Sequence, residues 1–234
     1  MASQANATTP TPQEKRLLQS AMALAGERGW HGFTLVQAAE QAAIPLAQAR
    51  VLCPFKPVLM GWLEAMADSR ALSNPASGTV REKLFEQLMA RLDVFQDYRP
   101  GVVAALRVTP LDPALAITGL VSGLGSLRWL ADRAGLDRRG LLGLVRLQAL
   151  GMAWMMTLRT WERDKGPDMA QTMKTLDEGL ERLERRGFLK AAQPIAEPAE
   201  PGVPDHLIIT GGAASSPKGQ DGDDSWPDEL PPDL

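Results

Sequence analysis

The fold is decided by residues 34–56, which read TLVQAAEQAAIPLAQARVLCPFK. Thr34 precedes Gln37 by three residues, which is the capping-box pattern, so a short helix is predicted to begin directly after Thr34. Pro45 ends that helix, because proline fits the first turn of a helix but not its interior. A second short helix is therefore predicted over residues 45–52, and two further prolines separate it from a third.

A set of residues in this stretch and on both sides of it matches a known signature in ungapped register. The matching residues are Gly29, Trp30, Phe33, Thr34, Ala39, Ala42, Ile44, Ala47, Pro54, Lys56 and Leu59. In this pattern the chain resembles TetR-type transcriptional regulators over roughly residues 13–63. The resemblance implies an all-α fold with a three-helix helix-turn-helix domain, whose third helix lies in the DNA major groove. It also implies a larger helical domain behind it that binds a ligand and dimerises.

The chain departs from that signature on the surface that would read DNA. Ala43 stands at the usual turn glycine, and Pro45 and Leu46 replace polar residues at the start of the recognition helix. Arg50 and Leu52 replace the aromatic residue and the histidine that usually contact phosphates. Four polar side chains remain as candidate DNA contacts, namely Thr34, Gln48, Arg50 and Lys56.

A second class of protein shares this fold without reading DNA. The degenerate helix-turn-helix is also similar to the TetR-fold lipid-binding accessory proteins of ubiquinone biosynthesis, which bind isoprenoid lipid through the helical domain and present intermediates to a hydroxylase. The apolar residues at positions 45, 46 and 52 favour this class. The register of residues 34–59 and the regulator-like segment 168–173 favour a regulator that binds a DNA operator. The regulator is the first hypothesis and the lipid-binding protein is the alternative.

Charge is distributed unevenly along the 234 residues. Residues 1–187 hold 23 basic and 19 acidic residues, whereas residues 188–234 hold 2 basic and 9 acidic residues. In the helix-turn-helix region, residues 12–70, six basic residues stand against five acidic ones. A domain that neutralises several DNA phosphates normally has a larger basic excess, so only weak non-specific DNA affinity is expected.

Composition and periodicity divide the chain into four predicted segments. Residues 1–10 are a disordered arm, and residues 11–56 are the helix-turn-helix domain. Residues 57–187 form the helical domain for effector binding and dimerisation. Residues 188–234 are a disordered, acidic and proline-rich tail, because they lack any apolar period that could offset the entropy of ordering them.

Local signals place several helices outside the deciding stretch. Thr11 and Thr79 are each followed three residues later by Glu, so both begin helices as capping boxes. Asp137 is predicted to cap the longest apolar helix, over residues 138–164. Apolar residues lie on nearly every side of that helix, which predicts deep burial. An amphipathic helix over residues 168–186 follows it.

The helical domain also carries signals of close helix packing. Gly119, Gly123 and Gly125 would allow another helix to approach closely. The resemblance assigns the last two helices, residues 138–164 and 168–186, to a two-fold homodimer interface. Independently, a small domain has difficulty covering so many Leu, Met and Trp side chains alone.

Methionine and tryptophan are concentrated in the second half of the chain. Two interpretations remain open, a conventional core and the lining of an adaptable apolar pocket. The candidate pocket residues are Trp129, Met152, Met155, Met156 and Trp161. The ligand would be a small apolar molecule for a regulator, or an isoprenoid lipid in the alternative.

The sequence gives little support for catalysis or metal binding. One cysteine excludes an intramolecular disulfide, and two histidines leave too few soft ligands for a structural zinc site. No Ser/His/Asp or Cys/His arrangement is present, and Cys53 is expected to be a buried thiol. We therefore expect no enzyme activity, no cofactor and no metal. The first residues lack an apolar segment behind positive charge, so a cytoplasmic location is expected.

Overall fold

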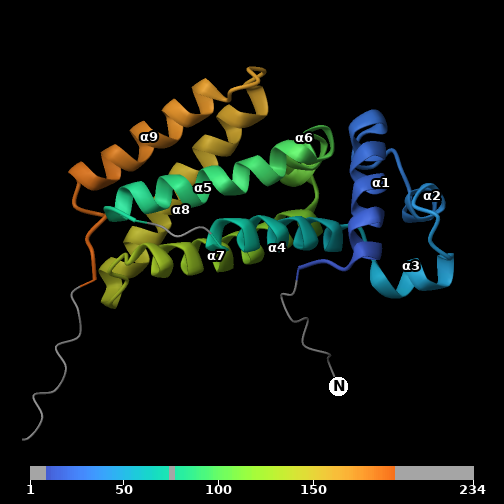
Figure 1. Ribbon diagram of the computed structural model, residues 1–234, viewed down its shortest axis with the longest axis horizontal. Coiled ribbons are helices and arrows are strands. Elements are labelled where there is room, and N and C mark those ends of the chain that lie inside the picture. The colour runs from blue at the N-terminus through green and yellow to red at the C-terminus, as the bar shows by residue number, and fades with distance from the viewer. Residues whose placement is uncertain (1–8, 74–76, 193–234) are drawn as a thin grey trace, which may run out of the picture. The chain divides into compact units, whose positions relative to one another are not determined.

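The computed structural model describes residues 9–73 and 77–192, and every regular element in these ranges is helical (Figure 1). The elements are α1 (Pro12–Arg28), α2 (Leu35–Gln41), α3 (Leu46–Leu52), α4 (Pro57–Ser73), α5 (Val80–Asp97), α6 (Arg99–Val108), the 3-10 helix η1 (Thr109–Leu111), α7 (Pro113–Ala134), α8 (Gly140–Arg163) and α9 (Ala170–Arg185). The predicted all-α class is confirmed.

Threonine caps set the start of three helices. Thr11, Thr34 and Thr79 precede α1, α2 and α5, and each hydroxyl accepts a hydrogen bond from the backbone N–H three residues later. In return, the side chain at that third position accepts from the N–H of the threonine. Each box satisfies two backbone donors that a helix start would otherwise leave unpaired. All three predicted capping boxes are confirmed.

Asp137 does not cap α8, and this prediction was wrong. The helix begins at Gly140, and its N-cap residue, Arg139, makes no side-chain capping bond. The Asp137 carboxylate instead accepts from the Arg139 N–H at 3.2 Å and from Nη1 of Arg146 at 2.9 Å. These two bonds, in that order, hold the pKa of Asp137 below its ordinary value. The Asp137 carboxylate therefore stabilises the loop that precedes α8.

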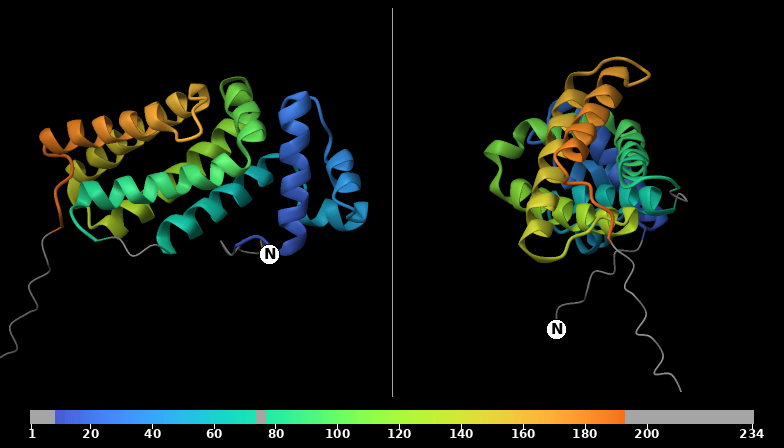
Figure 2. Two further views of the ribbon diagram at one scale, coloured as in Figure 1. Left: turned by 45° about the horizontal axis from the view of Figure 1, so that its top comes forward. Right: turned by 90° about the vertical axis from the view of Figure 1, so that its left-hand side faces the viewer.

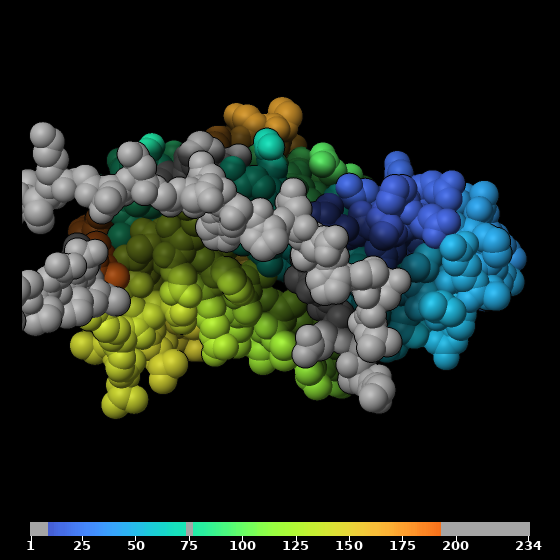
Figure 3. Space-filling view, turned by 60° about the horizontal axis from the view of Figure 1, so that its bottom comes forward, coloured from blue at the N-terminus to red at the C-terminus, as the bar shows by residue number. Residues whose placement is uncertain are grey.

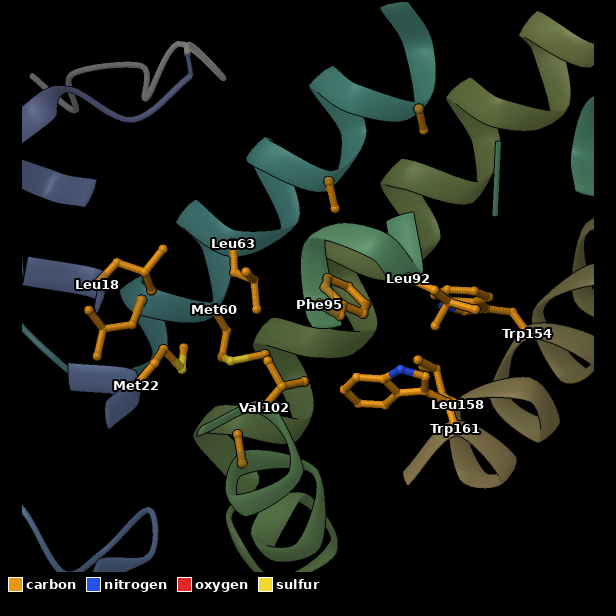
Figure 4. Close-up of a cluster of buried hydrophobic side chains, with 14 of the residues drawn as sticks. Leu18, Met22, Met60, Leu63, Leu92, Phe95, Val102, Trp154, Leu158 and Trp161 are labelled. Atoms are coloured by element: carbon orange, nitrogen blue, oxygen red, sulfur yellow. The ribbon is translucent and has the colours of Figure 1, made fainter. Parts of the chain in front are cut away.

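The buried core contains two groups of aromatic side chains. Trp30 and Phe33, after α1, pack edge to face with ring centroids 6.0 Å apart. Further along, Phe95 of α5 lies 6.3 Å from Trp154 and 6.4 Å from Trp161, both on α8. Figure 4 shows this second group in one buried cluster with aliphatic side chains of neighbouring helices.

Helices α1 and α6 lie side by side, and glycine makes their approach possible (Figure 2). A methyl group added at Gly101 would lie 2.5 Å from the carbonyl oxygen of Met22, which is closer than a carbon atom can approach. One added at Gly26 would lie 2.5 Å from Cβ of Pro100. The two helices are therefore in contact through their backbones.

The glycines of α7 do not play the predicted part within the chain. A methyl group added at Gly119, Gly123 or Gly125 would meet no neighbouring atom within 4 Å. No helix of the described chain packs against these positions, because that side of α7 faces outward. The prediction of a close helix approach there was wrong for the single chain.

Helices α7 and α8 lie on one side of the described chain (Figure 3), and their exposed side chains there are largely apolar; we call this surface the α7–α8 face. Its exposed side chains are Ile117, Leu120, Val121 and Trp129 of α7, and Leu141, Leu142, Leu144, Val145, Met152, Met155 and Met156 of α8. Both helices are long and apolar enough to cross a membrane by length and composition, a test that core helices of soluble proteins also pass. The predicted deep burial of the longest helix was wrong, because only one side of α8 packs against the chain.

The chain continues past α9 against the loop between α7 and α8. The Asp137 N–H donates to the carbonyl of Lys190, and the Ala192 N–H donates to the carbonyl of Gly135, both at 2.8 Å. Residues 188–192, which the sequence assigned to the tail, are therefore hydrogen-bonded to the helical body. The rest of the predicted tail and residues 1–8 of the predicted arm lie outside the described residues.

We expect the close contact of α1 with α6 to limit which residue position 101 tolerates. Gly101→Ala should lower the free energy of unfolding by about 1–3 kcal/mol, because the backbone of α1 must move to admit the methyl group. Urea unfolding followed by circular dichroism measures this. The matched control is Gly61→Ala in α4, where an added methyl group meets no atom within 4 Å, so helix propensity alone should raise stability by about 0.5–1 kcal/mol. Equal effects of the two substitutions would contradict the close approach.

Candidate nucleic-acid interface

Helices α2 and α3 form the two arms of the predicted helix-turn-helix, and the turn between them is tight. Ala43 has a φ of +52°, in the left-handed region that glycine usually occupies. The turn is held because the Ala43 N–H donates to the carbonyl of Glu40 at 3.0 Å and the Ile44 N–H donates to that of Ala39 at 2.9 Å. Ile44 is buried behind the turn. An alanine thus adopts the strained conformation that a helix-turn-helix glycine would adopt freely.

The outer face of α3 is more apolar than a surface that contacts phosphates. Ala49 is buried against the chain, whereas Leu46 is 49% exposed and Val51 is 81% exposed. Phe55, just after the helix, is 59% exposed. The exposed polar side chains of α3 are Gln48 and Arg50. The face that would enter the groove therefore has few hydrogen-bond donors among several aliphatic groups.

Two of the four candidate DNA contacts are occupied by neutral hydrogen bonds. The Thr34 hydroxyl accepts from the N–H of Gln37 at 3.2 Å as the cap of α2. The Gln48 side chain donates from Nε2 to Oε1 of Gln13 on α1 at 2.8 Å, which joins α3 to α1. Both residues remain exposed. Their polar atoms therefore already form hydrogen bonds that stabilise the domain.

The two basic candidates also have partners within the chain. Arg50 donates from Nη1 to the carbonyl of Pro54 at 2.9 Å. Lys56 donates from Nζ to the carbonyl of Trp30 at 2.8 Å and lies 4.2 Å from the ring centroid of Phe33. Burial lowers the pKa of Lys56, and the charge of Asp112 opposes that shift. A guanidinium has five donors and an ammonium has three, so both groups keep N–H bonds for a phosphate.

Behind α3 lies a small cavity of about 90 Å³, and Cys53, the only cysteine of the sequence, is one of the residues that line it. Cys53 is 2% exposed, and its thiol lies 3.5 Å from the carbonyl oxygen of Phe55. Burial raises the pKa of this thiol to about 12, and the hydrogen bond to Phe55 only partly opposes that shift. The predicted buried thiol is confirmed, and its position favours a packing role over nucleophilic chemistry.

The structure does not gather the five candidate pocket residues around one cavity. Trp129, Met152, Met155 and Met156 are exposed on the α7–α8 face, with exposed fractions between 48% and 70%. Trp161 is fully buried on the opposite side of α8, where its Nε1 donates to Oε1 of Gln96 at 3.0 Å. A ligand role for these residues stays a prediction.

A buried ionic cluster in the helical body was not anticipated from the sequence. Arg91 of α5 is 1% exposed and forms ion pairs with Glu64 and Asp68 of α4. Ser126 of α7 donates to Asp68 at 2.6 Å. Near it on α5, Gln87 is 1% exposed, and its amide has no hydrogen-bond partner among the described residues. Both polar residues fall on the apolar stripe of their helix, which was the signal available in the sequence.

No group of three or more His, Cys, Asp or Glu side chains in residues 9–73 and 77–192 is arranged to hold a metal ion.

Comparison with known proteins places the fold. No family model matches the chain, and no curated protein matches it. Among solved structures, the chain is similar to the TetR transcriptional regulator from Nitrosomonas europaea ATCC 19718, with a TM-score of 0.64 and 19% sequence identity. The match covers 75% of this chain and 99% of that one. The chain therefore has a TetR-like fold, whereas the similarity to accessory proteins of ubiquinone biosynthesis finds no support in these comparisons.

We expect Cys53 to resist alkylation while the protein is folded. With a pKa raised from 9.0 to about 12, its thiolate fraction at pH 8 is about a thousandfold below that of an exposed cysteine. Iodoacetamide labelling followed by mass spectrometry should be slow in buffer and fast in urea. The control carries Cys53→Ser with Ser69→Cys on the exposed side of α4. If native Cys53 reacts as fast as this control, the thiol is not buried.

Proposed function

We propose that this chain is a dimeric, cytoplasmic TetR-type transcriptional regulator that binds DNA through α2 and α3 and responds to a small apolar ligand. The observation that carries the proposal is the α2–turn–α3 unit, in which a short helix is presented outward on a TetR-like fold. The turn keeps the left-handed conformation at Ala43 even without glycine. Retention of this geometry favours a working recognition helix.

The charges near α3 predict how such a regulator would bind. Arg50 is exposed, and the hydrogen bond to Pro54 fixes its guanidinium near the end of α3. Lys56 follows between α3 and α4, with part of its ammonium free for a phosphate. Because the surrounding region has only a small basic excess, binding should depend strongly on these two cations and on salt.

We expect a mobility shift with DNA flanking the protein's own gene at low salt. Arg50→Ala should weaken the shift, because it removes a phosphate-binding charge without disturbing a buried group. Lys56→Ala should weaken it as well, with some loss of stability from the contacts to Trp30 and Phe33. The charge-matched control is Arg185→Ala at the end of α9, which should bind as the parent does. No shift at any salt concentration would remove the repressor proposal.

The α7–α8 face supports the proposed homodimer and changes which helices would form it. The exposed side of α9 is charged, through Lys174, Asp177 and Glu178 among others. Leu176 and Leu180 of α9 are fully buried within the chain. We therefore assign the two-fold contact to α8 with α7, instead of the expected pair α8 and α9. A second copy would remove this apolar surface from water.

We expect Leu144→Glu to convert the dimer into folded monomers. Leu144 is 62% exposed in the single chain, so a carboxylate there should hardly change the stability of the monomer. In a two-fold contact the same substitution would bury two carboxylates, one from each copy. Size-exclusion chromatography with light scattering gives the mass, and circular dichroism reports folding. Leu180→Glu is the contrasting variant, and it should unfold the chain because Leu180 is fully buried. A parent protein that is already monomeric would contradict the proposed contact.

A second candidate function is a TetR-fold protein that binds lipid and does not read DNA. It is favoured by a specific observation, namely that all four candidate DNA contacts have hydrogen-bond partners within the chain. The exposed apolar side chains on the outer face of α3 also favour this second candidate. Native mass spectrometry of the purified protein separates the two candidates, because it reports both the dimer mass and any lipid that co-purifies.

A further inference from the structure

A cavity of about 650 Å³ opens where α1 passes the corner between α5 and α6. This is within the usual size of sites for small molecules, which span about 300–1,000 Å³. We call it the α1–α6 groove. It lies away from α7 and α8, which carry the candidate pocket residues for an apolar effector. Nothing in the proposed function accounts for it.

One part of the groove lining is acidic and aromatic. Glu27 comes from α1, Asp97 ends α5, and Tyr98 follows it directly. Both carboxylates are exposed, and neither forms an ion pair with any described residue. Tyr98 is half-buried; its burial, and then the negative charge of Asp97, raise the pKa of its hydroxyl. The groove lining therefore combines two negative charges with a half-buried phenol side chain.

The remainder of the lining is mostly apolar. Met22, Ala23 and Gly26 of α1 lie in this lining with Pro100 of α6, which is in close contact with Gly26, and Gln19 of α1 adds an amide. The basic residue between Tyr98 and Pro100 does not neutralise the site. Arg99 donates to Oε1 of Gln96 and to the carbonyls of Trp161 and Asp164 at the end of α8, and its guanidinium lies 4.7 Å from the ring centroid of Trp161. No basic side chain lines the groove.

We propose that the α1–α6 groove binds a small organic cation, an amine or quaternary ammonium that carries an apolar group. The ammonium would lie between Glu27 and Asp97, within reach of the Tyr98 ring, which attracts cations through its π-electrons. The apolar group would cover Met22 and Pro100. Two carboxylates and no basic side chain in the lining favour a cationic ligand over a neutral or an anionic one.

A ligand in this groove would contact both α1 and α6, because residues of both helices line it. Backbone atoms of Gly101 and Met22 are in direct contact below it, so there is no room for α1 and α6 to move closer together. A ligand that bridges the two walls would hold α1 in place relative to α6. Because α1 also carries Gln13, the partner of Gln48 on α3, this restraint reaches the helix-turn-helix.

The test uses a charge series of similar shape on the full-length protein. Isothermal titration calorimetry should show 4-phenylbutylamine binding at pH 7, with 4-phenylbutan-1-ol about tenfold weaker and 4-phenylbutyrate without binding. Glu27→Gln and Asp97→Asn should each weaken amine binding about threefold to fivefold, and the double variant should bind amine and alcohol alike. Circular dichroism checks that each variant is folded, which both exposed positions should permit.

The matched control is Asp93→Asn, which removes an exposed carboxylate one turn earlier on α5 and outside the groove. It should leave amine affinity unchanged. Equal affinity for amine and alcohol in the parent protein would overturn the proposal, as would an equal loss in the Asp93 and Asp97 variants. Binding of a lysine-rich peptide without binding of the amine would also overturn it, because the groove would then recognise a protein segment. DNA binding is measured separately and does not decide this result.

Discussion

The guanidinium of Arg91 is the interaction on which the arrangement of the helical body depends. A buried charge is tolerated only with its partners in place, and removal of one partner typically costs about 3–5 kcal/mol. Its carboxylate partners come from α4, a hydroxyl on α7 holds one of them, and Trp154 of α8 lies 5.7 Å away as a cation–π contact. Four helices are thus fixed in register by one cation. Any other register would leave this buried charge without its partners, so the cluster disfavours alternative packings of these helices.

The sequence predicted elements whose signals are local. The pair Thr34 and Gln37 determines where α2 begins, because both partners of the capping box lie within one turn. Structural features that depend on tertiary packing were predicted poorly from the sequence. Nothing local distinguishes Gly101, which contacts another helix, from Gly119, which contacts none. Asp137 has the right residue type for a cap, but Arg146 provides a competing partner nine residues later.

The candidate interface shows the same limit. Residue types at positions 48, 50 and 56 could be recognised from the register of the helix-turn-helix. The hydrogen-bond partners of those side chains could not be predicted. Lys56 donates to a backbone carbonyl 26 residues earlier, and Gln48 donates to a side-chain amide 35 residues earlier. Such contacts leave no periodic pattern. They also bear on function, because Gln48 and Lys56, two of the candidate DNA contacts, also hold the end of the helix-turn-helix to α1 and to the loop after it.

The buried thiol behind α3 has a consequence for regulation by oxidants. Oxidation of cysteine proceeds through the thiolate and requires access for peroxide, and Cys53 offers neither while the protein is folded. With one cysteine in the sequence, no second thiol is available to form an intramolecular disulfide with it. The Cys53 thiol therefore gives the helix-turn-helix little means of responding to oxidants while the protein is folded. A structural signal from the helical body would reach α3 through α2, which packs against it, or through α1, whose Gln13 accepts a hydrogen bond from Gln48.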